Sequence, residues 1–169
     1  LQQLPIPRAL AEVGIHLMCC GSRYPKNDTA LIMEKVTLDL GAYVRHAKEE
    51  LGYENVVLLG WSGGGSLSLF YQAEAEDPTI TNTPAGDPVD LTAADLVPAD
   101  AVMFIAAHAS RALTLTEWMD ASVRDEINPE DRDPELDIYN PNNPNHPPFN
   151  SKFLLRYRNE QIGRNRKIT

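Results

Sequence analysis

The feature that most constrains this chain is the run Gly-Trp-Ser-Gly-Gly-Gly at positions 60–65. It follows the apolar residues Val56–Leu59 and precedes small and apolar residues at 66–73, a composition typical of a helix. This order predicts a strand, a sharp turn and a helix. We expect the glycines to be a steric requirement, because bulk near Ser62 would block both the turn and the close approach of helix and strand.

Positions 60–64 also satisfy the pattern G-x-S-x-G, which between a strand and a helix is typical of a nucleophile elbow. Such a turn holds a serine side chain clear of the backbone at the carboxyl edge of a sheet. The bare pattern arises by chance in roughly one of twenty chains of this length. The flanking strand and helix therefore give the prediction most of its support. A glycine-rich turn without any chemistry is the alternative.

Two nucleotide-binding loops are excluded by residue register. A Walker A loop requires a lysine after its last glycine, but Ser66 and Leu67 follow Gly65. A dinucleotide fingerprint requires G-x-G-x-x-G, and the third position counted from Gly60 is Ser62. A phosphate at the helix N-terminus is physically compatible with the motif, but acyl chemistry is favoured over it.

Composition indicates one soluble domain with a sizeable core, because 43% of the 169 residues are hydrophobic. There is no run of 18 apolar residues, so no membrane span is expected. The net charge of −9 argues against nonspecific nucleic-acid binding. The adjacent Cys19 and Cys20 predict buried free thiols and favour a reducing, cytoplasmic location. Because Leu1 is not methionine, we expect the natural start, with any targeting segment, to lie upstream.

Charge is unevenly distributed along the chain. Residues 74–100 contain seven acids and no Lys or Arg, and residues 116–137 contain nine acids and two arginines. Residues 152–167 reverse the sign, with six Lys or Arg against Glu160. The acidic segments are expected to be solvated loops. Alternatively, the basic segment is a helix that docks on the acidic stretch.

Apolar runs without alternation predict buried strands at Ile15–Cys20, Asn55–Leu59 and Ala101–Ala107. These strands alternate with helices, as in a parallel α/β sheet. Residues 77–100 hold four prolines and few large apolar groups, so we expect a long irregular loop there, and another at 128–150. Helices are expected at Pro7–Glu12, from Asn27 or Asp28 to Leu51, at 66–76, at Leu113–Val123 and at Ser151–Thr169.

These residues resemble the middle of an α/β-hydrolase, and the resemblance covers nearly all of the chain. Residues Cys19–Asp28 look like the loop after the family's fourth strand, Val56–Gly65 matches the fifth strand and its elbow, and Ala101–Ala107 looks like the sixth strand. The resemblance implies a partial α/β-hydrolase core over residues 1–110 and the start of a helical cap over residues 111–169. The expected fold class is therefore α/β, with a parallel sheet between helices.

Other parts of the family's pattern have no place in the chain. In the family, three strands and a His-Gly loop precede this region, and that loop supplies one oxyanion donor. The catalytic acid and histidine follow the seventh and eighth strands. We therefore expect these 169 residues to be the central part of a longer enzyme.

The motif and the resemblance together assign two catalytic roles. Ser62 is the expected nucleophile, and it needs an adjacent base because a free serine hydroxyl reacts poorly at neutral pH. The backbone N–H of Gly63 is an expected oxyanion donor at a helix N-terminus, where the dipole favours negative charge. Trp61, His108 and Arg23 are candidate pocket residues, and His108 is also a candidate base. For these three, strand packing, local hydrogen bonding and loop bracing are the respective alternatives.

The sequence therefore predicts a serine hydrolase that acts on a carboxylic ester or a similar small acyl substrate without a cofactor. No Cys/His spacing indicates a metal site, and the acidic residues 125–137 do not match a calcium-binding loop. The alternative is a non-catalytic binding or interaction protein that retains the elbow but lacks the triad. An aspartate and then a histidine on strands further downstream would favour the enzyme.

Overall fold

The computed structural model describes residues 5–25, 31–108 and 110–168. The chain divides into two compact units, Leu1–Ala109 and Ser110–Thr169, and each is described by itself. This division falls one residue before the domain boundary expected from the sequence. The described part of the chain contains no helix with the length and apolar character needed to cross a membrane.

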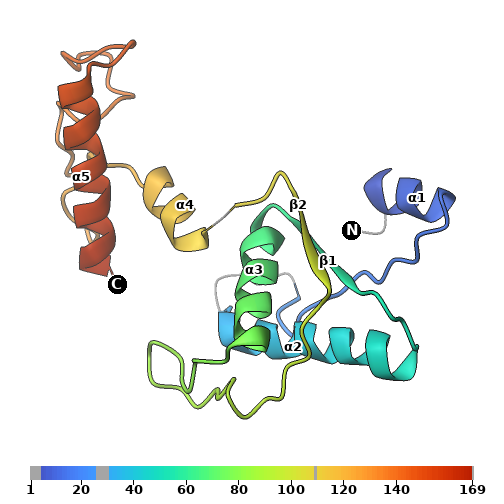
Figure 1. Cartoon of the computed structure of the whole chain (residues 1–169). Coiled ribbons are helices and arrows are strands. Elements are labelled where there is room, and N and C mark those ends of the chain that lie inside the picture. Colours follow the sequence, from blue (N-terminus) through green and yellow to red (C-terminus); the bar gives the residue numbers. More distant parts are fainter. Residues whose placement is uncertain (1–4, 26–30, 109, 169) are drawn as a thin grey trace. The chain divides into compact units, whose positions relative to one another are not determined.

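The first unit is mixed α/β and contains a small parallel sheet of two strands (Figure 1). Strand β1 (Val57–Trp61) pairs with β2 (Ala101–Ile105), and Trp61 lies opposite Ile105 in the ladder. Helix α3 (Gly63–Glu76) begins directly after the turn at β1 and packs against both strands. The predicted strand, turn and helix are therefore confirmed with shifted bounds, since β1 begins and ends two residues later than the predicted strand Asn55–Leu59 and α3 begins at Gly63 instead of Ser66.

Helix α2 (Met33–Arg45) continues through a π-helical turn, η2 (His46–Glu50), and packs against α3. The predicted cap of this helix, Asn27 or Asp28, lies outside the described residues. Gly41, inside α2, is buried, and a Cβ there would lie 2.7 Å from the Leu96 side chain. Glycine at this position therefore permits the Leu96 side chain to pack closely against α2.

The core of the first unit lies between the sheet and the helices α2 and α3. Its buried centre consists of Val44, Leu58, Tyr71 and Ala99. The Tyr71 hydroxyl donates a hydrogen bond of 2.5 Å to the Val97 carbonyl. Residues 77–100 contain no helix or strand, which confirms the prediction of an irregular loop, and this loop closes one side of the core.

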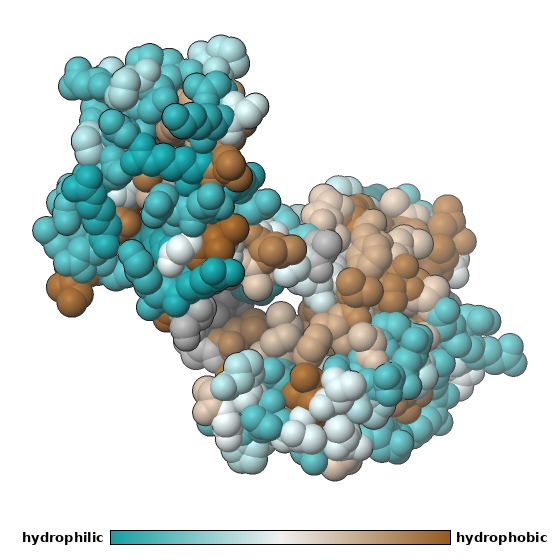
Figure 2. Space-filling view, turned by 60° about the vertical axis from the view of Figure 1, so that its left-hand side comes forward, coloured by the Kyte–Doolittle hydropathy of each residue, from teal (hydrophilic) through white to brown (hydrophobic). Residues whose placement is uncertain are grey.

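Along the strands, residues that face this core alternate with residues on the opposite face of the sheet, and the latter leave apolar surface exposed. Val57, Trp61 and Met103 are 50%, 46% and 49% exposed. Figure 2 shows apolar surface, in brown, over much of the first unit, at the right of that view. Parallel sheets are normally covered on both faces, whereas the core of the described residues forms on one.

The predicted buried strand Ile15–Cys20 is wrong. These residues have no regular secondary structure, and Ile15 and Leu17 are exposed, while the His16 ring contacts the Tyr53 hydroxyl. An apolar run becomes a strand only where another strand is available to pair with it, and a sequence window does not contain that information. A complete α/β-hydrolase sandwich is accordingly not shown, and the described sheet has two strands instead of three.

The prediction of buried thiols is wrong for the same segment. Cys19 is exposed and Cys20 is half-buried, and both are free. Burial, followed by the charge of the neighbouring Cys19, raises the pKa of Cys20 to about 11. Cys20 is therefore a protonated thiol at neutral pH rather than a nucleophile.

The second unit is built on helix α5 (Ser151–Ile168), which packs against α4 (Arg111–Trp118). The Ser110 hydroxyl caps α4 by accepting a hydrogen bond from the Leu113 N–H at 3.3 Å. Helix α4 ends earlier than predicted. The Asp120 carboxylate, just beyond the helix, accepts hydrogen bonds from the Ser122 N–H and hydroxyl, and such local bonds compete with helix formation.

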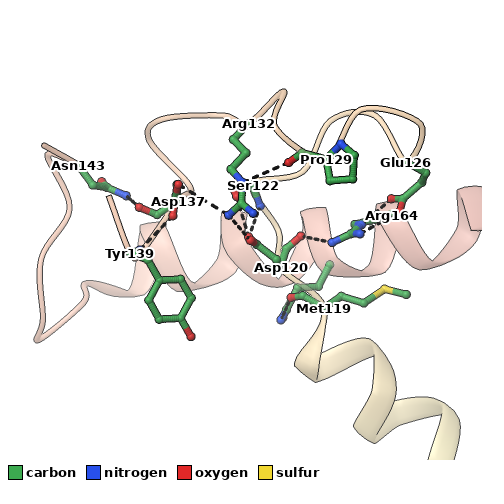
Figure 3. Close-up of polar contacts among 11 residues, drawn as sticks. Met119, Asp120, Ser122, Glu126, Pro129, Arg132, Asp137, Tyr139, Asn143 and Arg164 are labelled. Carbon is green, nitrogen blue, oxygen red and sulfur yellow. Dashed lines mark hydrogen bonds and ion pairs between the residues drawn. The ribbon is translucent and has the colours of Figure 1, made fainter. Parts of the chain in front are cut away.

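Helix α5 carries most of the basic residues of the second unit and docks on its acidic loops. Arg156 pairs with Asp133 at 2.8 Å and with Glu135 at 2.6 Å. Arg164 pairs with Glu126 at 2.5 Å and donates to the Asp120 carbonyl at 2.8 Å (Figure 3). For residues 116–137 the structure thus shows the alternative, a basic helix docked on acidic residues, instead of the expected acidic residues that are only solvated.

Candidate functional site

The candidate site is built around the backbone of Ser62, between β1 and α3. Ser62 has φ 52° and ψ −123°, a conformation that residues with a side chain rarely adopt. Its N–H donates to the Ile105 carbonyl at 3.2 Å. Its own carbonyl accepts hydrogen bonds from the N–H groups of Gly65 at 3.0 Å and of His108 at 3.1 Å. The turn is therefore held by the helix that follows it, by the last residue of β2 and by His108 beyond that strand.

Two of the glycines around Ser62 are required by close packing. A Cβ on Gly60 would lie 2.6 Å from Gly65 Cα and 2.7 Å from the Gly64 carbonyl oxygen. A Cβ on Gly65 would lie 2.3 Å from the Ala107 Cβ. The predicted steric requirement is confirmed at Gly60 and Gly65. It is wrong for Gly64, where a Cβ would meet nothing within 4 Å.

Gly63 is the first residue of α3 and follows Ser62 directly. The first N–H groups of a helix have no acceptor within the helix, and they lie at the positive end of its dipole. The Ser62 side chain makes no capping hydrogen bond to them. All the hydrogen bonds that Ser62 makes with other described residues use its backbone. The arrangement thus presents a serine hydroxyl beside backbone donors suited to an anion.

Trp61 and His108 flank the turn. Trp61 ends β1 and is 46% exposed. His108 is half-buried, and its backbone N–H contacts the Ser62 carbonyl. The structure therefore brings the backbone of His108 next to the predicted nucleophile. The roles of both residues in a pocket stay predictions.

Arg23 lies in a different environment and contacts helix α2. Its Nη2 lies 2.6 Å from Asp39 Oδ1, and its backbone N–H donates to Asp39 Oδ2 at 2.8 Å. Burial by itself would raise the pKa of Asp39, but the hydrogen bonds from Arg23 hold it below its ordinary value. The contacts shown for Arg23 tie the loop after Cys20 to α2.

Two residues of this site, Ala106 and Ala107, are not predicted by any pattern in the sequence. Ala106 has φ 44°, and Ala107 faces Gly65 across the close contact described above. An alanine pair at the end of an apolar run is typical of a continuing strand. Only the conformation of the backbone shows that β2 ends at Ile105 and that the next residues turn toward Ser62.

The second unit contains an open groove of about 460 Å³ beside α5. Aromatic side chains line much of it, and the Phe149 and Phe153 rings stack with centroids 4.7 Å apart. Gln161, also in the lining, is buried, and its amide donates to the carbonyls of Glu117 and Met119 at 2.7 and 2.8 Å. The Gln161 amide therefore bonds to backbone carbonyls of the same unit.

Among residues 5–25, 31–108 and 110–168, no group of three or more His, Cys, Asp or Glu side chains is placed to hold a metal ion. Comparisons of the chain with models of protein families, with curated proteins and with solved structures found no match. The local geometry at Ser62 is therefore the feature of this chain that bears on its function.

Proposed function

We propose that this protein is a serine hydrolase of the α/β-hydrolase type that acts by acyl transfer on a carboxylic ester or a similar small acyl substrate. The observation that carries the proposal is the backbone of Ser62, at φ 52° and ψ −123°. Glycine adopts such a conformation readily, whereas a residue with a side chain pays about 1–3 kcal/mol of strain. A serine at a position where glycine is more favourable supports a use for its hydroxyl.

In the proposed reaction, Ser62 Oγ attacks the carbonyl carbon while a base removes the hydroxyl proton. The Gly63 N–H donates a hydrogen bond to the oxyanion that forms. The carbon–oxygen bond to the alcohol then breaks, and the alcohol leaves with a proton. Water hydrolyses the acyl-serine, which releases the acid and restores Ser62. The proposal assigns roles to Ser62 and Gly63 and names no residue as the base. Every hydrogen bond described for Ser62 is made by its backbone, so none of them identifies a base for its hydroxyl.

The proposal is tested by treating the natural protein with a fluorophosphonate probe and mapping the adduct by mass spectrometry. We expect one adduct, on Ser62, and none in Ser62→Ala. Ser66 offers a matched control, because it lies in the next turn of α3 with its hydroxyl donating to the Gly63 carbonyl at 3.0 Å. Ser66→Ala should keep the adduct and the hydrolysis of short-chain aryl esters.

Absence of an adduct on the wild-type protein would contradict the proposal. So would an adduct on another residue, or ester hydrolysis that Ser62→Ala leaves intact. The first result would favour the non-catalytic alternative, in which the turn is a structural feature, and the other two would assign the activity to a residue other than Ser62.

A further inference from the structure

The four residues Ile105–His108, which we call the elbow brace, bond to Ser62 on both sides. The Ile105 carbonyl accepts from the Ser62 N–H at 3.2 Å, and the His108 N–H donates to the Ser62 carbonyl at 3.1 Å. These two bonds hold the peptide planes before and after Ser62. Because φ and ψ are the rotations between those planes, the brace restrains both dihedral angles of Ser62.

Ala106 gives the brace its shape. In an ordinary β-turn, the carbonyl of the first residue accepts a hydrogen bond from the N–H of the fourth. Here those two groups, from Ile105 and His108, both bond to Ser62. Ala106 lies between them at φ 44°, a left-handed conformation that is strained for alanine.

Ala107 sets the distance between the brace and helix α3. A Cβ on Gly65 would lie 2.3 Å from the Ala107 Cβ, so the two positions accommodate a single methyl group between them. Gly65 in turn donates its N–H to the Ser62 carbonyl at 3.0 Å. A change in the spacing of Ala107 and Gly65 would therefore be transmitted to Ser62.

We infer that Ala106 and Ala107 are positioning residues for the nucleophile, and that the elbow brace, together with the glycines of the turn, imposes the conformation in which Ser62 reacts. This inference rests on the proposed function, since the position of Ser62 matters chemically only if its hydroxyl reacts. Neither alanine is assigned a contact with substrate.

The first test is a double-mutant cycle that measures the rate of Ser62 labelling by the fluorophosphonate probe in the natural protein. Gly65→Ala should slow labelling by about 100-fold, because small misplacements of a catalytic group cost that much. Ala107→Gly should slow labelling less, by about tenfold, because it leaves a gap at this contact instead of an overlap. The variant with both substitutions should recover most of the rate, because the remaining contacts of the new Cβ, to Ala107 Cα and Phe104 Cδ1, are 3.4 Å.

A second pair of variants covers the case in which Gly65→Ala does not fold. Ala106 is exposed, so substitutions there create no buried overlap. Ala106→Gly keeps the positive φ and should label at the wild-type rate. Ala106→Val disfavours that φ strongly, so it should label about tenfold more slowly and unfold at a lower temperature than Ala106→Gly, while remaining folded at the temperature of the assay.

The outcomes separate the inference from the proposed function. The inference is supported if the labelling rate recovers in the variant with both substitutions, or if labelling is slow in Ala106→Val and not in Ala106→Gly. If wild-type Ser62 is labelled but the folded double variant does not recover, or Ala106→Val reacts as fast as wild type, the inference is wrong and the proposed function stands. A wild-type protein that takes no adduct on Ser62 overturns both.

Discussion

Two of the three described non-glycine residues with positive φ lie at one turn, and the third, Asp95, lies in the loop 77–100. Ser62 and Ala106 both have positive φ, at 52° and 44°, although glycine would be the less strained choice at either position. Such violations persist where the surrounding structure determines the backbone, and they are concentrated at functional sites. Under the proposed function, the Ser62 hydroxyl is the reason for a serine at this strained position. For Ala106, the positive φ accompanies the hydrogen bonds of the elbow brace to Ser62.

A substitution of Ser62 by glycine measures the strain directly. Ser62→Gly should be more stable than Ser62→Ala by about 1 kcal/mol in urea unfolding. The relief of about 1–3 kcal/mol of strain exceeds the extra unfolded-state entropy of glycine, which costs roughly 0.5–1 kcal/mol. Neither variant should take up the probe. An alanine variant that is the more stable of the two would show that the turn does not strain Ser62.

At the scale of secondary-structure elements, the junction of β1 and α3 depends on how closely the helix approaches the strand. Gly60, near the end of β1, faces the backbone of the first turn of α3, and backbone atoms cannot rotate away from an added methyl group. Gly64, four residues later, faces open space. The same glycine run therefore contains positions that are closed to a side chain, such as Gly60, and a position that tolerates one, Gly64.

These two glycines form a matched pair for measurement. Gly60→Ala should lower the free energy of unfolding by about 2 kcal/mol or more, because its Cβ would lie 2.6 Å from Gly65 Cα. Gly64→Ala should raise it by about 0.5–1 kcal/mol through helix propensity. Urea unfolding of both variants checks the prediction. Equal effects at the two positions would contradict the close helix–strand contact.

At the scale of the whole molecule, a chain of net charge −9 places several carboxylates beside hydrogen-bond donors. Hydrogen bonds from Arg164 lower the pKa of Glu126. Burial by itself would raise the pKa of Glu74, but the Thr79 and Ile80 N–H groups and the Thr79 hydroxyl lower it below its ordinary value. Both units therefore contain acids that are held in the charged form.

This arrangement predicts sensitivity to acid. Each folded pKa lies below the ordinary Glu value of 4.5, so the unfolded chain binds protons first as the pH falls. The stabilisation is fully present above that value and is lost as the pH falls through the lowered folded pKa. We expect the free energy of unfolding to change little between about pH 7 and 5.5 and to decline below about pH 4.5.

Glu74→Gln supplies the control for the acid prediction. The amide carries no negative charge, so the variant should be less stable than wild type at pH 7. Because the amide does not titrate in this pH range, the variant should also lose less stability on acidification. Urea unfolding across the pH range gives both values. Parallel declines for the variant and the wild type would show that Glu74 does not contribute to acid sensitivity.

Much of the first unit was predictable because its signals are local. The strand, turn and helix around Ser62 follow from the spacing of glycines and apolar residues, and the strand starting at Ala101 follows from an apolar run. The end of that strand was not predictable. Ala106 has a small apolar side chain suited to a strand, and its positive φ accompanies hydrogen bonds from its neighbours to a residue 44 positions earlier in the chain.

The position of the sharp turn and of the serine that stands at it follows from the sequence, since steric limits on glycine and apolar periodicity act over a few residues. The pairing of the apolar runs as strands, the irregular backbone of Ile15–Cys20 and the contact of Arg23 with Asp39 become visible in the folded chain. So do the hydrogen bonds by which the elbow brace holds Ser62. The physical reason is that pairing and burial depend on partners distant in the chain, and a local pattern does not specify those partners.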